Sequence, residues 1–367
     1  MNLLFYISGH GYGHARRMAQ VVRALSDLSP AATVRIRSAA PAHVLEPLSP
    51  ESIEKCDLDA GVVERDPLTI DREASLDRLV QFMGRREATI AGEAEVVHRL
   101  RPALIVADIP FLAGEVACRA GVPCVGISNF TWDWIYDHLF GDDPRYAAIA
   151  PWVREGYGKM DALLELPFGR TSPSIATKIA MPLIAGKSRI GPEEVLAQIG
   201  VPANDRRPRV LFGTRGGLPP GALAVAARDA GEFLFLCVHE PPEGLPANAK
   251  VVRLSPRLDF SDVLAVSSVV VSKLGYGIVS DCIAAGVPLV WPRREGFVED
   301  EVMAADAPKW LPMIQMPRED YQAGRWGRSL REALALAAPT QRMPIGGAEA
   351  CAEYLTSPAP RRASPGP

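Results

Sequence analysis

The sequence lacks the cysteine spacing of a zinc-binding or disulfide-stabilised protein. Its 6 cysteines are scattered, mostly in apolar runs, and no C-x-x-C pair occurs. Structural zinc sites and disulfide frameworks both depend on regularly spaced cysteines. We therefore expect neither disulfide bonds nor a metal site.

Strong charge and long apolar runs are also absent. The net charge of −3 over 367 residues gives no electrostatic reason for nucleic-acid binding. No apolar run approaches the roughly 20 residues that cross a bilayer, and no signal peptide precedes the first strand pattern. We therefore expect a cytoplasmic protein without a transmembrane segment, which leaves a peripheral membrane contact open.

What is present indicates an α/β protein of two domains. A hydrophobic content of 48% and a charged content of 23% are typical of globular proteins, and 367 residues exceed one ordinary core. Strand and helix patterns alternate along the chain, which predicts doubly wound parallel sheets. The predicted parts are a first domain, a linker, a second domain, a helix that packs back on the first domain, and a disordered tail: residues 1–185, 186–208, 209–345, 346–356 and 357–367.

The first domain opens with a glycine turn between a strand and a helix. The strand Leu3–Ile7 is followed by G-x-G-x-G-H at Gly9–His14. This pattern differs from the dinucleotide fingerprint G-x-G-x-x-G, and the next strand ends at Arg37 without the acidic residue that holds a ribose. NAD binding is therefore disfavoured, and NADP binding through Arg37 is a weak alternative.

Two residues at this edge of the first sheet form a candidate base. His14 follows the glycine turn, and Asp108 ends the separate strand pattern Ala103–Ala107. In a parallel sheet both positions face one crevice, where a carboxylate can orient an imidazole that removes a proton from a hydroxyl. His10 is the rival base in the same turn. The alternative for His14 is a helix-start residue that hydrogen-bonds only to the backbone.

Aromatic and polar residues follow the next strand pattern, Val122–Ile127. The segment Ser128–Asp137 mixes both kinds of side chain, which is typical of a substrate cleft beyond a strand end. A packed loop is the alternative. Asn129, Trp132 and Asp133 are the candidate acceptor residues.

The second domain has two glycine turns that suit a nucleotide. The strand Val269–Val271 leads through glycines into the helix Ile278–Ala285, and free N–H groups at such a helix start favour an anion. A further turn along, Asp281 could hold a ribose. The alternatives are a structural Asp281 and solvated charges at Lys273 and Arg215. The candidate nucleotide and phosphate residues are Gly213, Thr214, Arg215, Gly216, Lys273, Gly275, Tyr276, Gly277, Ser280 and Asp281.

This set of motifs resembles the GT-B glycosyltransferases. The run K-L-G-Y-G-I-V-S-D at 273–281, followed by A-G-V-P at 285–288, is similar to the donor-nucleotide motif of UDP-glycosyltransferases and of the peptidoglycan N-acetylglucosaminyltransferase. The chain most closely resembles the N-terminal, glycosyltransferase-like domain of plant L-arabinokinases. This likeness reaches from the N-terminus to about Asp300 and includes four further segments: Gly9–His14, Leu68–Arg72, Ser128–Asp133 and Arg293–Arg294.

The resemblance implies a GT-B fold, in which two Rossmann-like domains face each other across a cleft. It implies an inverting, metal-independent transfer of a sugar from a nucleotide sugar, UDP-linked in this family, to a small-molecule or glycoconjugate acceptor, without a further cofactor. His14 matches the family's base and Asp108 its partner, while Lys273 stands in place of a phosphate-contacting histidine.

The sequence departs from the family at the donor. Asp281 replaces a ribose-binding Glu and is one methylene shorter, and Glu301 replaces the Gln of an Asp-Gln pair that holds sugar hydroxyls. An acidic cluster here can accept hydrogen bonds from sugar hydroxyls or favour an amino sugar, and it should repel a uronic acid unless Arg293 or Arg294 offsets its charge. A solvated charge run is the alternative. The candidate donor-sugar residues are Arg294, Glu299, Asp300 and Glu301.

Three other functions follow from the same resemblance. A nucleotide-sugar 2-epimerase on this fold needs no acceptor, and a non-catalytic module binds the nucleotide sugar without turnover. A sugar kinase is excluded, because the sequence contains neither the P-x-G-L-G-S-S phosphate loop of that kinase class nor a P-loop lysine motif.

Overall fold

The computed structural model divides the chain into two compact units. Unit 1 contains Met1–Glu64, Ile70–Ile184 and Pro344–Pro367, and unit 2 contains Arg65–Thr69 and Ala185–Met343. No helix in the described part of the chain is long and apolar enough to cross a membrane. The structure describes all residues except 42–44, 46–49, 214–218, 239–243 and 358–367.

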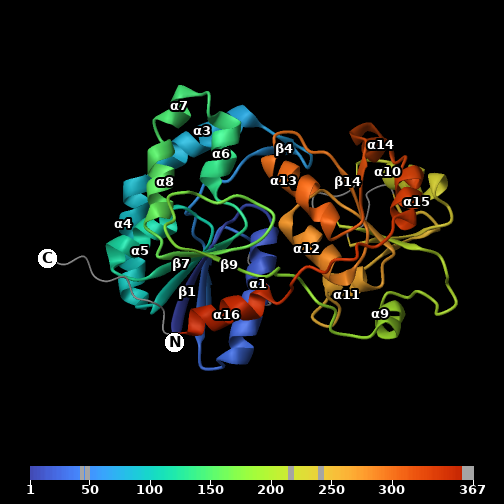
Figure 1. Ribbon diagram of the computed structural model, residues 1–367, viewed down its shortest axis with the longest axis horizontal. Helices are drawn as coiled ribbons and strands as arrows, with labels where there is room; N and C mark the ends of the chain where they lie inside the picture. The colour runs from blue at the N-terminus through green and yellow to red at the C-terminus, as the bar shows by residue number, and fades with distance from the viewer. Residues whose placement is uncertain (42–44, 46–49, 214–218, 239–243, 358–367) are drawn as a thin grey trace. The chain divides into compact units, whose positions relative to one another are not determined.

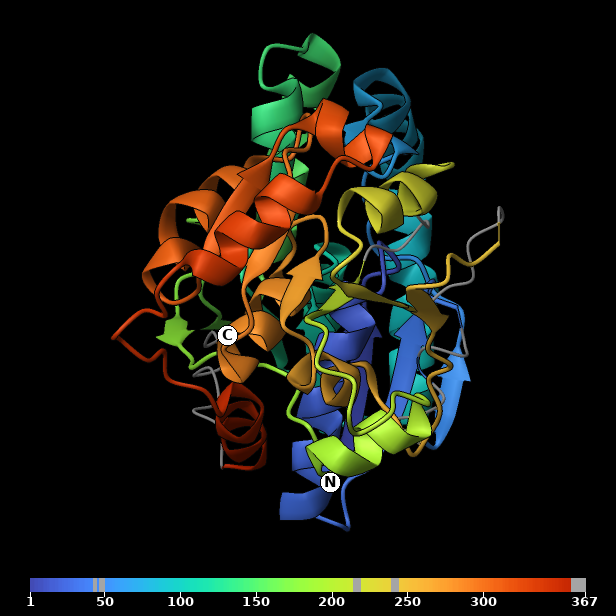
Figure 2. The ribbon, with the colours of Figure 1, turned by 90° about the vertical axis from the view of Figure 1, so that its right-hand side faces the viewer.

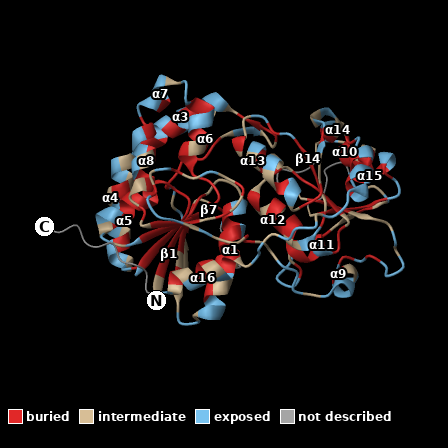
Figure 3. Ribbon diagram, in the orientation of Figure 1, coloured by how far each residue is buried: buried red, intermediate tan, exposed pale blue. Residues whose placement is uncertain are grey.

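Unit 1 is built on a parallel sheet in the order β3-β2-β1-β6-β7-β8-β9 (Figure 1). All residues of β6 and β7 are buried, because helices cover both faces of the sheet (Figure 3). The strands are β1 (Asn2–Ile7), β2 (Thr33–Ser38), β3 (Ser52–Glu54), β6 (Leu104–Asp108), β7 (Cys124–Ser128), β8 (Ala162–Glu165) and β9 (Lys178–Ala180).

The helices of unit 1 come from both ends of the chain. The last helix, α16, packs against the first, α1, and the two lie side by side in Figures 1 and 2. Backbone bonds from Gly347 to Leu183 and from Leu183 to Pro344 hold the start of α16. The helices are α1 (Gly13–Leu28), α3 (Arg72–Met83), α4 (Arg86–Leu100), α5 (Leu112–Ala120), α6 (Trp132–Phe140), α7 (Pro144–Ala147), α8 (Ala150–Gly158) and α16 (Gly347–Thr356).

Unit 2 repeats this architecture with a parallel sheet in the order β12-β11-β10-β13-β14-β15. On one face of the sheet, Trp326 is fully buried and stacks on Phe212 and Tyr321. The two parallel sheets confirm the predicted α/β class with two Rossmann-like domains. The strands are β10 (Arg209–Phe212), β11 (Leu234–Cys237), β12 (Ala249–Val251), β13 (Val269–Val271), β14 (Leu289–Pro292) and β15 (Met313–Met316).

The helices of unit 2 follow the predicted alternation, with shifted boundaries. The helix predicted at Ile278–Ala285 begins two residues earlier, at Tyr276, directly after Gly275. In the first domain, the segment Ser128–Asp137, predicted as a cleft lining or a packed loop, begins at the last residue of β7 and enters the helix α6 at Trp132. The helices of unit 2 are α9 (Pro192–Gln198), α10 (Ala222–Asp229), α11 (Phe260–Ala265), α12 (Tyr276–Ala285), α13 (Val298–Asp306), the 3-10 helix η2 (Ala307–Lys309), α14 (Arg318–Ala323) and α15 (Gly327–Ala335).

A short strap from the N-terminal half belongs to unit 2. The strands β4 (Glu64–Asp66) and β5 (Thr69–Ile70) form a small separate sheet, and Arg65–Thr69 between and within them is part of unit 2. The sequence placed these residues in the first domain. The structure differs because Leu68 is 3% exposed and packs in the core of unit 2, where an apolar side chain is stabilised by leaving water.

Candidate functional site

The carboxyl edge of the unit 1 sheet brings His14 and Asp108 together. His14 lies in the first turn of α1, and Gly11 in the preceding turn has a φ of 79°, which favours glycine. Asp108 is the last residue of β6, the neighbour of β1, and pairs with Ile7. The strand register therefore places His14 Nδ1 2.9 Å from Asp108 Oδ1.

The charge on Asp108 sets which nitrogen of the His14 ring donates a hydrogen bond. Burial raises the pKa of this fully buried carboxyl, but the neighbouring Arg17 and His14 outweigh burial and lower the pKa overall. An ionised carboxylate only accepts hydrogen bonds, so His14 donates through Nδ1. His14 Nε2 then carries the lone pair that a base needs.

Arg17 is the third member of this group, and the sequence reasoning missed it. Its side chain is 4% exposed, its Nε donates to Asp108 Oδ2 over 2.9 Å, and a terminal nitrogen donates to Asp108 Oδ1. Arg17 and His14 are three residues apart and so share one face of α1. The three-residue spacing was the signal in the sequence, but it did not show that Asp108 is the partner of Arg17.

Arg17 also connects Asp108 to the strand β7. Its Nη1 donates to Asn129 Oδ1 over 2.7 Å, and its Nη2 donates to Ser128 Oγ over 3.2 Å. Asn129 Nδ2 donates in turn to the carbonyl of Phe168. Asn129 was predicted as an acceptor residue, and the structure places it 1% exposed, inside the network that holds Asp108.

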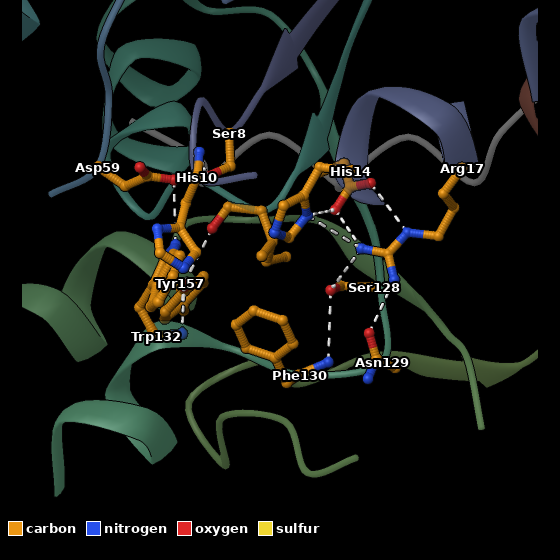
Figure 4. Close-up of polar contacts among 12 residues, drawn as sticks. Ser8, His10, His14, Arg17, Asp59, Ser128, Asn129, Phe130, Trp132 and Tyr157 are labelled. Atoms are coloured by element: carbon orange, nitrogen blue, oxygen red, sulfur yellow. Dashed lines mark hydrogen bonds and ion pairs between the residues drawn. The ribbon is translucent and has the colours of Figure 1, made fainter. Parts of the chain in front are cut away.

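A row of aromatic rings joins the two histidines of the glycine turn (Figure 4). The His10 ring meets Trp132 edge-on at 5.3 Å, Trp132 meets Phe130 at 5.2 Å, and Phe130 meets His14 at 5.7 Å between ring centroids. Trp132 is 2% exposed, because the first turn of α6 turns it into unit 1. The Trp132 ring therefore contacts the rings of His10 and Phe130 in the interior of unit 1.

The other predicted acceptor residue, Asp133, is also buried. Its side chain is in the first turn of α6, and the residue is 2% exposed. Its Oδ1 has no hydrogen-bond partner among the residues that the structure describes. The structure thus places Asn129, Trp132 and Asp133 together in the interior of unit 1, beside the His14 network.

Asp59 is a second buried acid near the histidines, and no sequence pattern pointed to it. Its Oδ2 accepts the indole N–H of Trp132 over 3.0 Å. Burial raises the pKa of Asp59 to about 6, against the lowering effects of hydrogen bonds from Ser8 and Trp132. Asp59 therefore changes charge in a pH range in which Asp108 stays ionised.

We expect Asp59→Asn to remove a pH dependence of stability. A carboxyl with a raised pKa stabilises the fold below its unfolded value, about 3.9, and loses that contribution as the pH rises through about 6. The wild type should therefore lose about 2 kcal/mol relative to Asp59→Asn between pH 4 and pH 7. Urea unfolding across this range measures the difference, with Asp27→Asn on the exposed side of α1 as the control. A pH-independent difference contradicts the prediction.

In unit 2 the glycine turn Lys273–Gly277 lies at the carboxyl end of β13. Lys273, Gly275 and Gly277 are partly exposed there, at the start of α12, where free backbone N–H groups can meet an anion. Gly213 directly follows the adjacent strand β10, and its N–H donates to the carbonyl of Val271. Thr214, Arg215 and Gly216 lie outside the described residues. Within the described residues, no group of three or more His, Cys, Asp or Glu could hold a metal ion.

Asp281 binds the segment in which the chain passes from unit 1 to unit 2. Its Oδ1 accepts the backbone N–H of Gly186 over 2.7 Å, and the residue is 7% exposed. A Cβ at Gly186 would lie 2.1 Å from Ser261 Oγ, so a larger residue at this position requires the Ser261 hydroxyl to move. The preceding residue, Ser280, is fully buried and its Oγ has no partner among the described residues. The structure thus gives Asp281 a structural contact that the ribose hypothesis did not include.

The donor-sugar candidates contain a buried ion pair. Arg294 Nε lies 3.1 and 3.0 Å from the two oxygens of Asp300, and both side chains are 5% exposed. The Arg294 guanidinium stands 3.8 Å above the centre of the Phe297 ring. Glu299 is partly exposed and Glu301 is exposed on the same helix, α13. Arg294 therefore offsets the charge of Asp300 within the acidic cluster.

The chain is similar to a much longer plant enzyme. It is 30% identical over 357 residues to an L-arabinokinase of Arabidopsis thaliana. The match covers 96% of this chain and 34% of the plant protein, so the chain spans about a third of the relative that it matches. No family model matches the chain. The similarity to L-arabinokinase that the motifs indicated is confirmed.

Solved structures share both units of the fold. CalG4, the calicheamicin glycosyltransferase, has a TM-score of 0.62 at 16% identity, with 91% of this chain and 90% of that chain covered. Phytolacca americana UGT2, complexed with UDP-2-fluoro-glucose and pterostilbene, has a TM-score of 0.58 at 13% identity, with 97% and 96% covered. A protein named as a UDP-N-acetylglucosamine 2-epimerase of Listeria monocytogenes has a TM-score of 0.55 at 15% identity, with 96% and 94% covered.

These similarities establish the architecture and leave the chemistry to the site itself, because one fold hosts several activities. The order of strands in each sheet and the coverage of more than nine-tenths of the chain agree. The chain therefore has the GT-B fold, with two Rossmann-like domains, as these glycosyltransferases do.

Proposed function

We propose that the protein is an inverting glycosyltransferase that moves a sugar from a nucleotide sugar to an acceptor hydroxyl. The observation that carries this proposal is the His14–Asp108 pair, with a 2.9 Å hydrogen bond at the carboxyl edge of a parallel sheet. This edge is where α/β proteins bind their ligands. The similarity in fold to UGT2, complexed with UDP-2-fluoro-glucose, supports a UDP-linked donor.

In the proposed reaction His14 Nε2 removes the proton of the acceptor hydroxyl. The acceptor oxygen forms a bond to the anomeric carbon while the bond from that carbon to the β-phosphate oxygen breaks, so the configuration inverts. Asp108 stabilises the imidazolium that forms, and the hydrogen bonds from Arg17 keep the buried Asp108 carboxylate in position. The proposal requires that both units act on one pair of substrates.

The departing nucleoside diphosphate carries the electron pair of the broken bond. Backbone N–H groups at the start of α12 and the ammonium of Lys273 are suited to the growing phosphate charge. This scheme uses the nucleotide sugar as a co-substrate and routes no step through a metal ion or further cofactor.

A ligand panel tests the proposal. We expect UDP and at least one UDP-sugar to raise the melting temperature, since a ligand at 100 times its Kd stabilises the fold by about 2.7 kcal/mol. Lys273→Met should weaken UDP about tenfold and leave uridine unchanged, because only UDP carries the phosphates. Thermal shift and calorimetry measure both effects. If no nucleotide or nucleotide sugar binds the wild type, the proposal fails.

The second candidate function is a nucleotide-sugar 2-epimerase, which the similarity in fold to the Listeria monocytogenes protein favours. An epimerase converts the nucleotide sugar without an acceptor. Incubation of the protein with the donor alone, followed by NMR of the sugar, distinguishes the two reactions. A protein that binds UDP but shows no turnover with any acceptor or donor alone is a binding module.

A further inference from the structure

One motif from the sequence, Leu68–Arg72, has no part in the chemistry above. The structure divides this motif between the units. Asp71 belongs to unit 1 and caps α3 through a 3.0 Å bond from the Ala74 N–H to its Oδ1. Leu68 and Thr69 belong to unit 2 and end the strap Arg65–Thr69. One half of the motif therefore stabilises the start of α3 in unit 1, and the other half belongs to the strap in unit 2.

The strap is hydrogen-bonded to the loop that follows β14. The backbone N–H of Glu295 donates to the carbonyl of Leu68 over 2.8 Å, and Thr69 forms a parallel bridge with Glu295. The Leu68 side chain is buried in the unit 2 core, and its own N–H donates to Asp66 Oδ1. Leu68 thus anchors the strap while its backbone holds the loop.

Arg318 fixes the strap and the loop together from a third element. Its Nη2 donates to Thr69 Oγ1 over 2.6 Å and lies 3.5 Å from Asp66 Oδ2, and its Nη1 lies 3.6 Å from Glu295 Oε2. Arg318 is the first residue of α14, two residues beyond β15. Its Thr69 contact is the shortest of the three, and Thr69 is 8% exposed.

The loop that the strap holds is the one with the donor-sugar candidates. It runs from Arg293 to Phe297, between the carboxyl end of β14 and the start of α13. Arg294 in this loop makes the ion pair with Asp300. The strap therefore contacts the carboxyl edge of the unit 2 sheet, where the strands β13 and β14 are neighbours. This is the edge at which α/β proteins bind their ligands.

We infer that the strap Arg65–Thr69 and Arg318 form a positioning element that holds the loop 293–297 for the sugar part of a nucleotide sugar. The ligand in this inference rests on the proposed function, whereas the positioning rests on the contacts alone. At both ends the strap continues into unit 1. The donor-sugar loop therefore shares a covalent segment with the unit that contains His14.

Amide hydrogen exchange of the ligand-free protein tests the positioning. Thr69→Val keeps the volume of the side chain and removes the hydroxyl that Arg318 binds, while Thr69→Ser keeps the hydroxyl and is the matched control. Exchange in a peptide covering 293–297 should become about tenfold faster in Thr69→Val and stay unchanged in Thr69→Ser. Equal exchange in Thr69→Val and the wild type overturns the inference.

Calorimetry with UDP and UDP-glucose tests the consequence for the donor. Thr69→Val should raise the Kd of UDP-glucose about tenfold and leave that of UDP unchanged, whereas Thr69→Ser should behave as the wild type. Equal weakening of both ligands overturns the role toward the sugar, because a general loss of structure affects both. If the wild type binds neither, the proposed function fails, and the exchange result still decides the positioning.

Discussion

Replacing His14 by Ala is expected to lower the turnover number by about two orders of magnitude or more. In the proposed reaction, the 2.9 Å bond from Nδ1 to Asp108 leaves Nε2 to accept the proton of the acceptor hydroxyl. Without the ring, that proton has no acceptor held in place. The Kd of UDP should stay unchanged, since the residues proposed to bind the nucleotide are in unit 2. Steady-state kinetics and calorimetry measure the two quantities.

His10→Ala is the matched control for this prediction. His10 lies in the same glycine turn, and its ring contacts Trp132 at 5.3 Å, whereas the ring of His14 is hydrogen-bonded to Asp108. We expect His10→Ala to retain turnover within about tenfold, the loss of a packing contact. If His14→Ala keeps full turnover while His10→Ala loses it, His10 is the base and the assignment of His14 is wrong.

Arg17→Met is expected to lower the free energy of unfolding by about 3 to 5 kcal/mol, the usual cost of breaking a buried ion pair. Arg17 holds both oxygens of Asp108 and also binds Asn129. Methionine fills part of the space, but the carboxylate stays buried without its strongest partner. Urea unfolding at pH 7 measures the loss, and Arg16→Met, at an exposed neighbour, should change stability by less than about 0.5 kcal/mol.

The pH dependence of Arg17→Met separates the lost charge from lost packing. Asp108 has a lowered pKa, so it contributes stability above its unfolded value, about 3.9, and loses it as the pH falls through the lower folded value. The destabilisation by Arg17→Met should therefore shrink toward low pH, where a protonated Asp108 needs no cation. The double variant Arg17→Met/Asp108→Asn should recover part of the stability at pH 7. A loss that is the same at every pH indicates packing alone.

The sequence alone determined the architecture of both units. Glycine turns between buried strands and helices at Gly9–His14 and Lys273–Gly277 predicted parallel α/β sheets, and the strand orders confirm them. The rule that parallel strands end at one edge also put His14 and Asp108 at one crevice, and the two side chains are in contact. These inferences succeeded because they depend on local periodicity and on a general rule of chain connection.

Only the tertiary structure decided which side chains pair. Arg17 and Asp108 are 91 residues apart, Trp132 and Asp59 are 73 apart, and Arg318 and Thr69 are 249 apart. Hydrophobic patterns show which faces are buried, but a buried charge finds its partner through the packing of elements that are distant in sequence. The sequence therefore did not predict the roles of Asp59, Arg17 and the strap Arg65–Thr69, because only the fold brings their partners within hydrogen-bond distance.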